Sequence, residues 1–161
     1  MSHRQPPYAP PSGHSAPRRT PTDSSYYDFV NTSADQNTGQ TWMYARDARA
    51  QQATASQTPV RPYPNYYGNK SKTAPPLNLS TQPEAMYNPK TGKSTQGWLH
   101  TPLVPSRQTT WKGHKNSKAS PIGPVRSVYP PSNPNTFDVI YHEKKGDSDF
   151  VLAKYYPAAT R

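Results

Sequence analysis

The chain has 161 residues, of which only 17 are Leu, Ile, Val or Phe, and its formal net charge is +10. Chains with less than about 20% of these four residues and a strong net charge are usually disordered when isolated. The sequence has no cysteine, which excludes disulfides and thiolate metal sites, and no apolar run of about 18 residues, which excludes a membrane-spanning helix. We therefore expect a mostly irregular, extended chain with no autonomous core, which becomes ordered on a partner.

Four segments follow one another along the sequence. Residues 1–25 are rich in proline and predict a polyproline II or unstructured tail. Residues 26–57 begin with the aromatic stretch YYDFV and continue with TWMYARDARAQQATASQ, which predicts one short helix over 41–57. That stretch has no interior Pro or Gly, and Thr41 is a suitable N-cap. The Thr58-Pro59 pair is expected to end this helix.

The other two segments differ in their patterns. Residues 58–135 contain 14 prolines and no periodic hydrophobic pattern, so we expect an extended, basic, Pro-rich segment. In residues 136–161, Phe137, Val139 and Tyr141 alternate with polar residues, and a Gly-containing stretch precedes Phe150. This pattern predicts a C-terminal β-hairpin that serves as an anchor. A short helix over residues 148–155 is the alternative.

Positive charge is concentrated in the middle of the chain. Between Ala48 and Thr136 there are eleven Lys or Arg residues and a single acidic residue, Glu84. This distribution favours an acidic surface as the partner. The alternative is that a dispersed basic excess only keeps the chain soluble. The basic strip that we expect to face the partner consists of Lys70, Lys72, Lys90, Lys93, Arg107, Lys112, Lys115 and Lys118.

No motif in the sequence predicts catalysis. The stretch TGKST (91–95) resembles the end of a phosphate-binding loop, but the glycine that should stand five residues before Gly92 is Tyr87. The five histidines lack the paired spacing of a zinc site, and the carboxylates are few and scattered. A chain without a rigid core cannot hold catalytic groups in place. We therefore expect no enzyme activity, no catalytic residues, no metal and no cofactor.

Aromatic rings spaced along a proline-stiffened chain predict docking into pockets of another protein, because stiff chains lose less entropy on binding. SSYYDFVNTSADQNTGQTWMY (24–44) resembles the opening of the Pierce-type microtubule inner proteins, and NYYGNKSKTAP (65–75) is similar to a later Tyr-Gly element of that family. The resemblance implies a structural, non-catalytic protein that binds tubulin and neighbouring inner proteins inside the doublet microtubules of a cilium or flagellum. The expected anchors are Tyr26, Tyr27, Trp42, Tyr66, Tyr67, Trp98, Trp111, Phe137, Tyr141, Phe150 and Tyr155.

A second hypothesis is a basic RNA-associated protein, such as a ribosomal or mitoribosomal extension protein. Rings interleaved with Lys, as in WKGHKNSK (111–118), suit nucleic acid as well as tubulin. The N-terminal 21 residues lack the apolar core of a secretory signal, and their six prolines oppose the helix of a transit peptide. We therefore expect a cytoplasmic or cytoskeletal location, in the axoneme under the first hypothesis.

Overall fold

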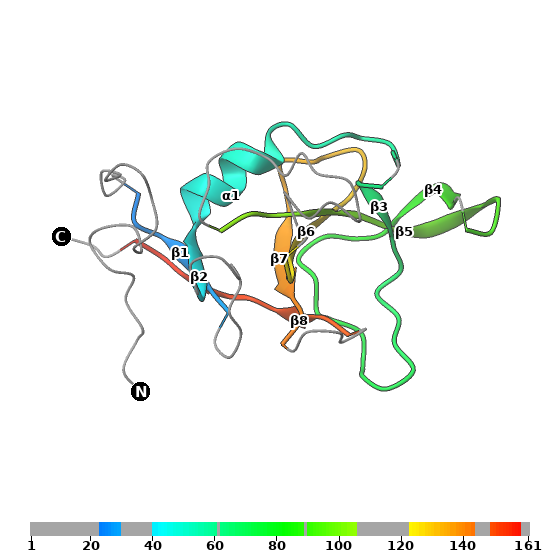
Figure 1. The fold of residues 1–161 in the computed structure, drawn as a ribbon. Helices are drawn as coiled ribbons and strands as arrows, with labels where there is room; N and C mark the ends of the chain where they lie inside the picture. Colours follow the sequence, from blue (N-terminus) through cyan, green and yellow to red (C-terminus); the bar gives the residue numbers. More distant parts are fainter. Residues whose placement is uncertain are drawn as a thin grey trace.

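Figure 1 shows the computed structural model, in which β-strands predominate. The structure describes residues 23–29, 40–60, 62–88, 90–105, 123–143 and 149–158. Among them, the one helix is α1 (Ala45–Gln52). The strands are β1 (Tyr26–Asp28), β2 (Trp42–Tyr44), β3 (Asn65–Tyr67), β4 (Glu84–Asn88), β5 (Lys93–Pro102), β6 (Val125–Tyr129), β7 (Asp138–Tyr141), β8 (Val151–Leu152) and β9 (Lys154–Tyr156). No helix of the described residues is long and apolar enough to cross a membrane.

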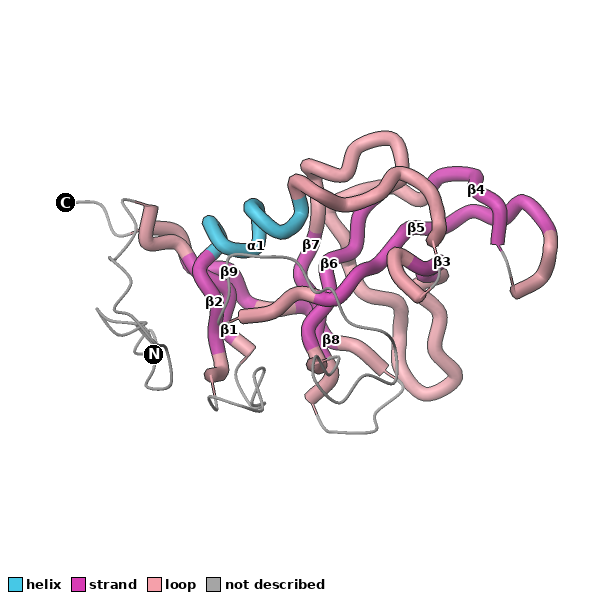
Figure 2. The backbone as a smooth tube through the Cα atoms, turned by 45° about the horizontal axis from the view of Figure 1, so that its top comes forward, coloured by secondary structure: helices cyan, strands magenta, loops and turns pink. Residues whose placement is uncertain are grey.

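The strands form two antiparallel sheets. The smaller sheet has the order β2-β1-β9, and the larger has the order β3-β5-β6-β7-β8, with β4 paired to β5. In Figures 1 and 2, α1 lies over one side of the molecule and the β4–β5 pair extends away from its body. The segment 58–135, which we predicted to be extended, therefore contains β3, β4, β5 and β6.

The C-terminal segment joins the two sheets. Leu152 of β8 pairs with Ile140 of β7 in the larger sheet, and the Ala153 amide donates to the Val139 carbonyl at 2.9 Å. Two residues later, Tyr155 of β9 pairs with Tyr27 of β1 in the smaller sheet. The predicted pairing of these C-terminal strands is confirmed for β7 and β8. The alternative helix is wrong, because Val151–Leu152 and Lys154–Tyr156 are strands. The pair is part of a larger sheet and does not stand alone.

Helix α1 is shorter than predicted, because Trp42 lies in β2 and Tyr44 occupies the N-cap position. The buried face of α1 includes glutamines that bind distant backbone. Gln51 donates from Nε2 to the Val104 carbonyl at 2.9 Å and accepts from the Val104 amide at 2.8 Å. Gln52 donates from Nε2 to the Pro134 carbonyl at 2.7 Å. These hydrogen bonds attach α1 to the rest of the protein, although its sequence has few large apolar residues.

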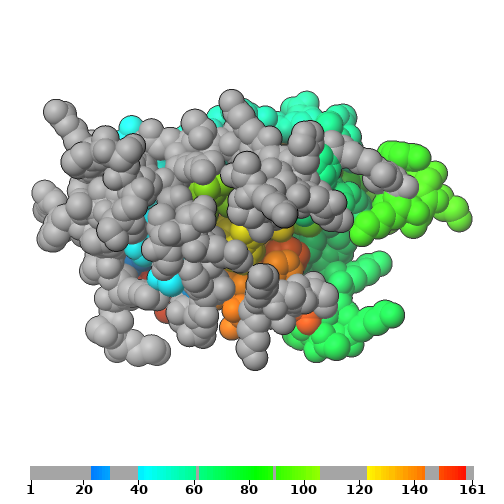
Figure 3. All heavy atoms as spheres, viewed as in Figure 1, coloured from blue at the N-terminus to red at the C-terminus, as the bar shows by residue number. Residues whose placement is uncertain are grey.

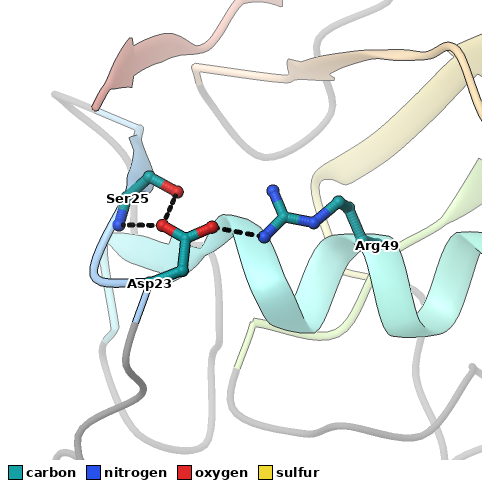
Figure 4. Close-up of polar contacts among 3 residues, drawn as sticks. All are labelled: Asp23, Ser25 and Arg49. Carbon is teal, nitrogen blue, oxygen red and sulfur yellow. Dashed lines mark hydrogen bonds and ion pairs between the residues drawn. The ribbon is translucent and has the colours of Figure 1, made fainter. Parts of the chain in front are cut away.

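An ion pair attaches the start of β1 to α1 on the surface (Figure 4). Asp23 accepts from the Arg49 guanidinium at 2.6 Å and from the Ser25 hydroxyl at 2.6 Å. The hydrogen bonds from Ser25, and then the charge and hydrogen bond of Arg49, lower the pKa of the Asp23 carboxyl. Both side chains of the pair are about half exposed, so the pair is expected to contribute less than about 1 kcal/mol.

The prediction of a mostly irregular chain with no core is wrong, because the structure has a packed β-sheet core. The largest cluster draws Phe29, Met43, Leu103 and Val139 from both sheets and from the loops between them. Among the described residues, seven of the buried apolar side chains are aromatic, and they are Tyr26, Phe29, Trp42, Tyr44, Trp98, Tyr129 and Tyr141. Each such ring buries roughly 150–250 Å², so a few of them replace many aliphatic residues. Counting Leu, Ile, Val and Phe therefore underestimated this core.

The larger sheet has two distinct faces. Successive side chains of a strand point to opposite faces, so on β6 Val125 and Tyr129 lie opposite to Arg126 and Val128. Val125 packs in the same cluster as Ala48 of α1. On the other face, Val128 packs with Trp98 of β5 and Ile140 of β7. Arg126 therefore lies on the sheet face that α1 does not cover.

Candidate functional site

Five side chains gather on the uncovered face of the larger sheet. His100 comes from β5 and Arg126 from β6, while His142 follows the end of β7 and Phe150 precedes β8. Tyr63 precedes β3, whose Asn65 is the Cα partner of His100. We call Tyr63, His100, Arg126, His142 and Phe150 the histidine–arginine cluster. Antiparallel pairing of β3, β5, β6, β7 and β8 brings these residues together from distant parts of the sequence.

Arg126 supplies a buried positive charge. Only 7% of its surface is exposed, and one guanidinium nitrogen donates to the carbonyls of Val125, at 2.9 Å, and Gly123. The guanidinium carbon lies 5.5 Å from the centre of the Tyr63 ring, and a hydrogen bond also joins the two side chains. The buried Nε atom has no hydrogen-bond partner among the described residues. Burial lowers the pKa of Arg126, but an arginine stays charged at neutral pH.

His100 is surrounded by rings. Its imidazole centre lies 5.6 Å from that of Tyr63, 5.5 Å from that of Tyr67 and 6.1 Å from that of Phe150. Burial lowers the pKa of His100 to about 3, and the positive charges of Arg126, Lys90 and His142 add to the effect. The imidazole is therefore neutral at physiological pH. Its Nδ1 atom is buried and has no hydrogen-bond partner in the described part of the chain.

His142 is held in one orientation. Its Nδ1 atom lies 2.7 Å from the Asp149 carbonyl oxygen, and its ring stacks on Phe150 with centres 3.7 Å apart. The carbonyl can only accept, so Nδ1 must donate, and in the neutral ring the lone pair is at Nε2. The His142 amide also donates to the Pro124 carbonyl at 3.1 Å. The backbone next to β6 thus fixes the position of His142 relative to Arg126.

A cavity of about 410 Å³ adjoins the histidine–arginine cluster. Tyr67, His100 and Phe150 line one part of it, and Asn69 and Lys70 of the following loop line another. The Asn69 side chain closes this loop, since it accepts from the Leu77 amide and donates to the Leu77 carbonyl, both at 2.8 Å. A cavity with aromatic walls and polar loop groups suits a planar, polar ligand.

Asp149 holds a different part of the same loop. Its carboxylate accepts from the Ser71 hydroxyl at 2.5 Å and from the Thr73 hydroxyl at 2.6 Å. These hydrogen bonds lower the pKa of the Asp149 carboxyl. Asp149 therefore links the loop to His142, because its carboxylate binds the loop and its backbone carbonyl binds the imidazole. No set of three or more His, Cys, Asp or Glu side chains in the described ranges could hold a metal ion.

The structure places most of the predicted anchors in the protein's own core. Tyr26, Trp42, Trp98 and Tyr141 are buried, while Tyr155 is exposed. Tyr27, Tyr66, Phe137 and Phe150 are half-buried and pack against core clusters. Tyr67 and Phe150 also lie at the candidate site. Residue 111, the tryptophan predicted as an anchor, lies outside the described residues.

The predicted basic strip is described only in part. Lys70, Lys72, Lys90 and Lys93 are exposed. Lys70 and Lys90 line the cavity beside the cluster. The other four members of the strip (107, 112, 115 and 118) lie outside the described residues.

Sequence reasoning missed Tyr63, His100, Arg126 and His142. His100 and His142 were dismissed because their spacing fits no metal motif, and Arg126 was counted only as one base of many. A weak signal was present for His142, because it directly follows the alternating Phe137, Val139 and Tyr141. Strand pairing alone brings the four missed residues together, and no local pattern encodes it.

No family model matches this chain, and no curated protein or solved structure matches it either. The interpretation of the candidate site therefore rests on its geometry and charge.

Proposed function

We propose that this protein binds single-stranded RNA at the histidine–arginine cluster and cleaves it by transferring the phosphoryl group to the neighbouring 2′-hydroxyl. The observation that carries the proposal is the buried Arg126, whose Nε lacks a partner in the described part of the chain, on the same sheet face as His100. A buried guanidinium is a strong phosphate ligand, because its N–H groups match two oxygens at once. The net charge of +10 also favours a polyanion.

The two imidazoles supply the proton transfers that this reaction needs. His100 is neutral, so it can accept the proton of the 2′-hydroxyl. Burial is the main cause of its lowered pKa, and a bound phosphate would offset the smaller part that the charges of Arg126, Lys90 and His142 add. As the 2′-oxygen bonds to phosphorus, the bond to the 5′-oxygen breaks, and His142 in its protonated form donates a proton from Nε2 to that oxygen. The products are a 2′,3′-cyclic phosphate and a 5′-hydroxyl. Arg126 stabilises the charge on the non-bridging oxygens.

RNA carries its nucleophile next to the phosphate, so the site has to provide only an acid, a base and a fixed cation. The aromatic cavity beside His100 supports the proposal, because a base can stack on Tyr67 or Phe150 while its phosphate lies at Arg126. The absence of a rigid scaffold was one reason to expect no catalysis, and the β-sheet core removes that reason.

Tubulin binding in an axoneme stays an untested prediction. That prediction assumed that rings such as Trp98 and Tyr141 have no core within this chain and must be buried against a partner. In the structure, both rings are buried within the chain itself.

The direct test incubates the purified protein with a labelled RNA of mixed sequence and analyses the ends of the products. Wild type should release fragments with 2′,3′-cyclic phosphates, and it should bind but not cleave the 2′-deoxy strand. His142→Ala and Arg126→Ala should each lower the cleavage rate at least 100-fold. Lys154→Ala, a change of an exposed residue on β9, is the matched control.

The outcomes are distinct. If the wild type binds RNA without cleaving it, the catalytic half of the proposal is wrong. Cleavage that persists unchanged in His142→Ala would come from a contaminating nuclease and would count against the proposal in the same way. Thermal melting of each variant shows whether a loss of activity reflects unfolding. Absence of any binding to RNA would reject the proposal as a whole.

A further inference from the structure

The β4–β5 pair forms an arm that extends beyond the rest of the described chain. Figure 1 shows the arm at one end of the molecule, and in Figure 3 the same residues project from the surface. Along β4, Ala85 and Tyr87 are exposed while Met86 and Asn88 are buried. Tyr87 is the cross-strand partner of Ser94, which is also exposed. One face of the arm is therefore open to a ligand.

Tyr87 is unusual on this open face, because 61% of its surface is exposed. Large rings are normally buried, and an exposed ring on a positively charged element can stack on a nucleic acid base. Lys90, in the turn that joins β4 to β5, and Lys93, the first residue of β5, are both exposed close to Tyr87 in the sequence of the arm. The arm therefore combines a stacking surface with cations that can bind a backbone phosphate.

A groove of about 880 Å³ lies between β4 of the arm and the segment before β3. Met86 and Tyr87 of the arm line it, and the segment before β3 contributes Val60, Pro62 and Pro64. Among the described residues that line it, Lys90 is the one that carries a charge, and its ammonium group can attract an anion. Its apolar walls suit the flat face of a base.

Several residues of the groove are neighbours of the histidine–arginine cluster. Pro62 and Pro64, which line the groove, flank Tyr63, which lies over Arg126. Asn65 also lines the groove and is the Cα partner of His100 in the pairing of β3 with β5. Lys90 lines both the groove and the cavity beside His100. A strand whose phosphate lies at Arg126 can therefore extend toward the groove.

We propose that the groove and the arm bind the nucleotides next to the scissile phosphate of the same RNA strand, with a base on Tyr87 and a phosphate on Lys90. This inference rests on the proposed function and adds an extended subsite to it. Because the arm binds nucleotides beyond the reacting pair, its contribution depends on the length of the RNA.

The test measures binding of a fluorescent octanucleotide and of a dinucleotide, both with 2′-fluoro sugars, so that no cleavage can occur. Tyr87→Ala should weaken binding of the octanucleotide about tenfold, the effect of losing one stacked base. Binding of the dinucleotide should be unchanged. Tyr87→Phe keeps the ring and should behave as wild type. Lys154→Ala, which changes an exposed residue on β9 of the smaller sheet, is the control.

Two results would overturn the inference. If Tyr87→Ala weakens neither ligand, or both equally, the arm is not an extended subsite, although the proposed function would stand wherever the wild type binds RNA. If the wild type binds neither ligand, the proposed function fails and this inference with it. Lys90→Ala should reduce the dependence of octanucleotide affinity on salt, because one phosphate contact is lost.

Discussion

The Nδ1 atom of His142 lies 2.7 Å from the backbone carbonyl oxygen of Asp149, which connects the end of β7 to the residues that precede β8. The same Asp149 holds Ser71 and Thr73 through its side chain. Asp149 therefore orients His142 through its backbone carbonyl and holds the loop through its carboxylate. A substitution that removes only the carboxylate should separate these two functions.

Asp149→Ala should keep the orientation of His142, because the backbone carbonyl remains. We expect the rate of dinucleotide cleavage to fall less than about threefold, whereas His142→Ala should lower it at least 100-fold. The loop should instead lose order, since the Ser71 and Thr73 hydroxyls lose their acceptor. Amide hydrogen exchange at Thr73 and Ala74, whose N–H groups bond to Ser71, should become faster. Unchanged exchange would mean that the carboxylate does not hold this loop.

His100 should make the stability of the protein depend on pH. Burial lowers its pKa to about 3 from an ordinary value near 6.5. Between these two pH values the unfolded state binds the proton and the folded state does not. The free energy of unfolding should therefore fall as the pH decreases through this range, by up to about 1.4 kcal/mol per pH unit.

Urea denaturation of the wild type and of His100→Asn, at pH values from 4 to 7, measures this contribution. The difference between the two proteins should change with pH, and it should level off above about pH 6.5. Equal pH dependence in both proteins would show that the imidazole titrates normally in the folded state.

The core should produce a cooperative unfolding transition in the purified chain. Leu99 is fully buried in β5 and packs with Met86 and Tyr129. Leu99→Ala should lower the free energy of unfolding by about 2–5 kcal/mol, through lost burial and the cavity that remains. Leu152→Ala is the matched control, because Leu152 is 36% exposed and should cost less than about 1 kcal/mol. A gradual, non-cooperative melt would contradict the packed core.

Gly97 should not tolerate a side chain. A Cβ atom at this position would lie 2.9 Å from Cζ and still nearer to Cε2 of the Tyr66 ring, and 3.0 Å from the Tyr67 carbonyl oxygen. Gly97→Ala should therefore cost about 1–3 kcal/mol by forcing β3 away from β5. In a protein that already carries Tyr66→Ala, the change Gly97→Ala should lower the free energy of unfolding by less than it does in the wild type, because the obstructing ring is absent. Strict additivity would mean that the ring is not the obstacle.

Part of the secondary structure of this chain was predictable from its sequence. Alternation around Val139 and Tyr141 predicted a strand where β7 lies, and the stretch 41–57 predicted a helix, of which Ala45–Gln52 is helical. The absence of a core was predicted wrongly, because the content of Leu, Ile, Val and Phe does not account for polar groups such as Gln51 and Gln52, which dock the helix through hydrogen bonds. Tyrosines were also treated as ligands for a partner. Tyr129 shows why this fails, since its ring is buried and its hydroxyl donates to the Ser56 carbonyl at 2.8 Å.

By itself, the sequence determined the net positive charge, the lack of cysteine chemistry and the short periodic segments, because each of these is a property of residues near one another or of their sum. Only the tertiary structure decided that Arg126, His100 and His142 share one site. Antiparallel pairing places residues from separate strands side by side, and the buried environment that they create lowers the pKa of His100. Both effects depend on contacts between distant parts of the chain, which no local pattern specifies.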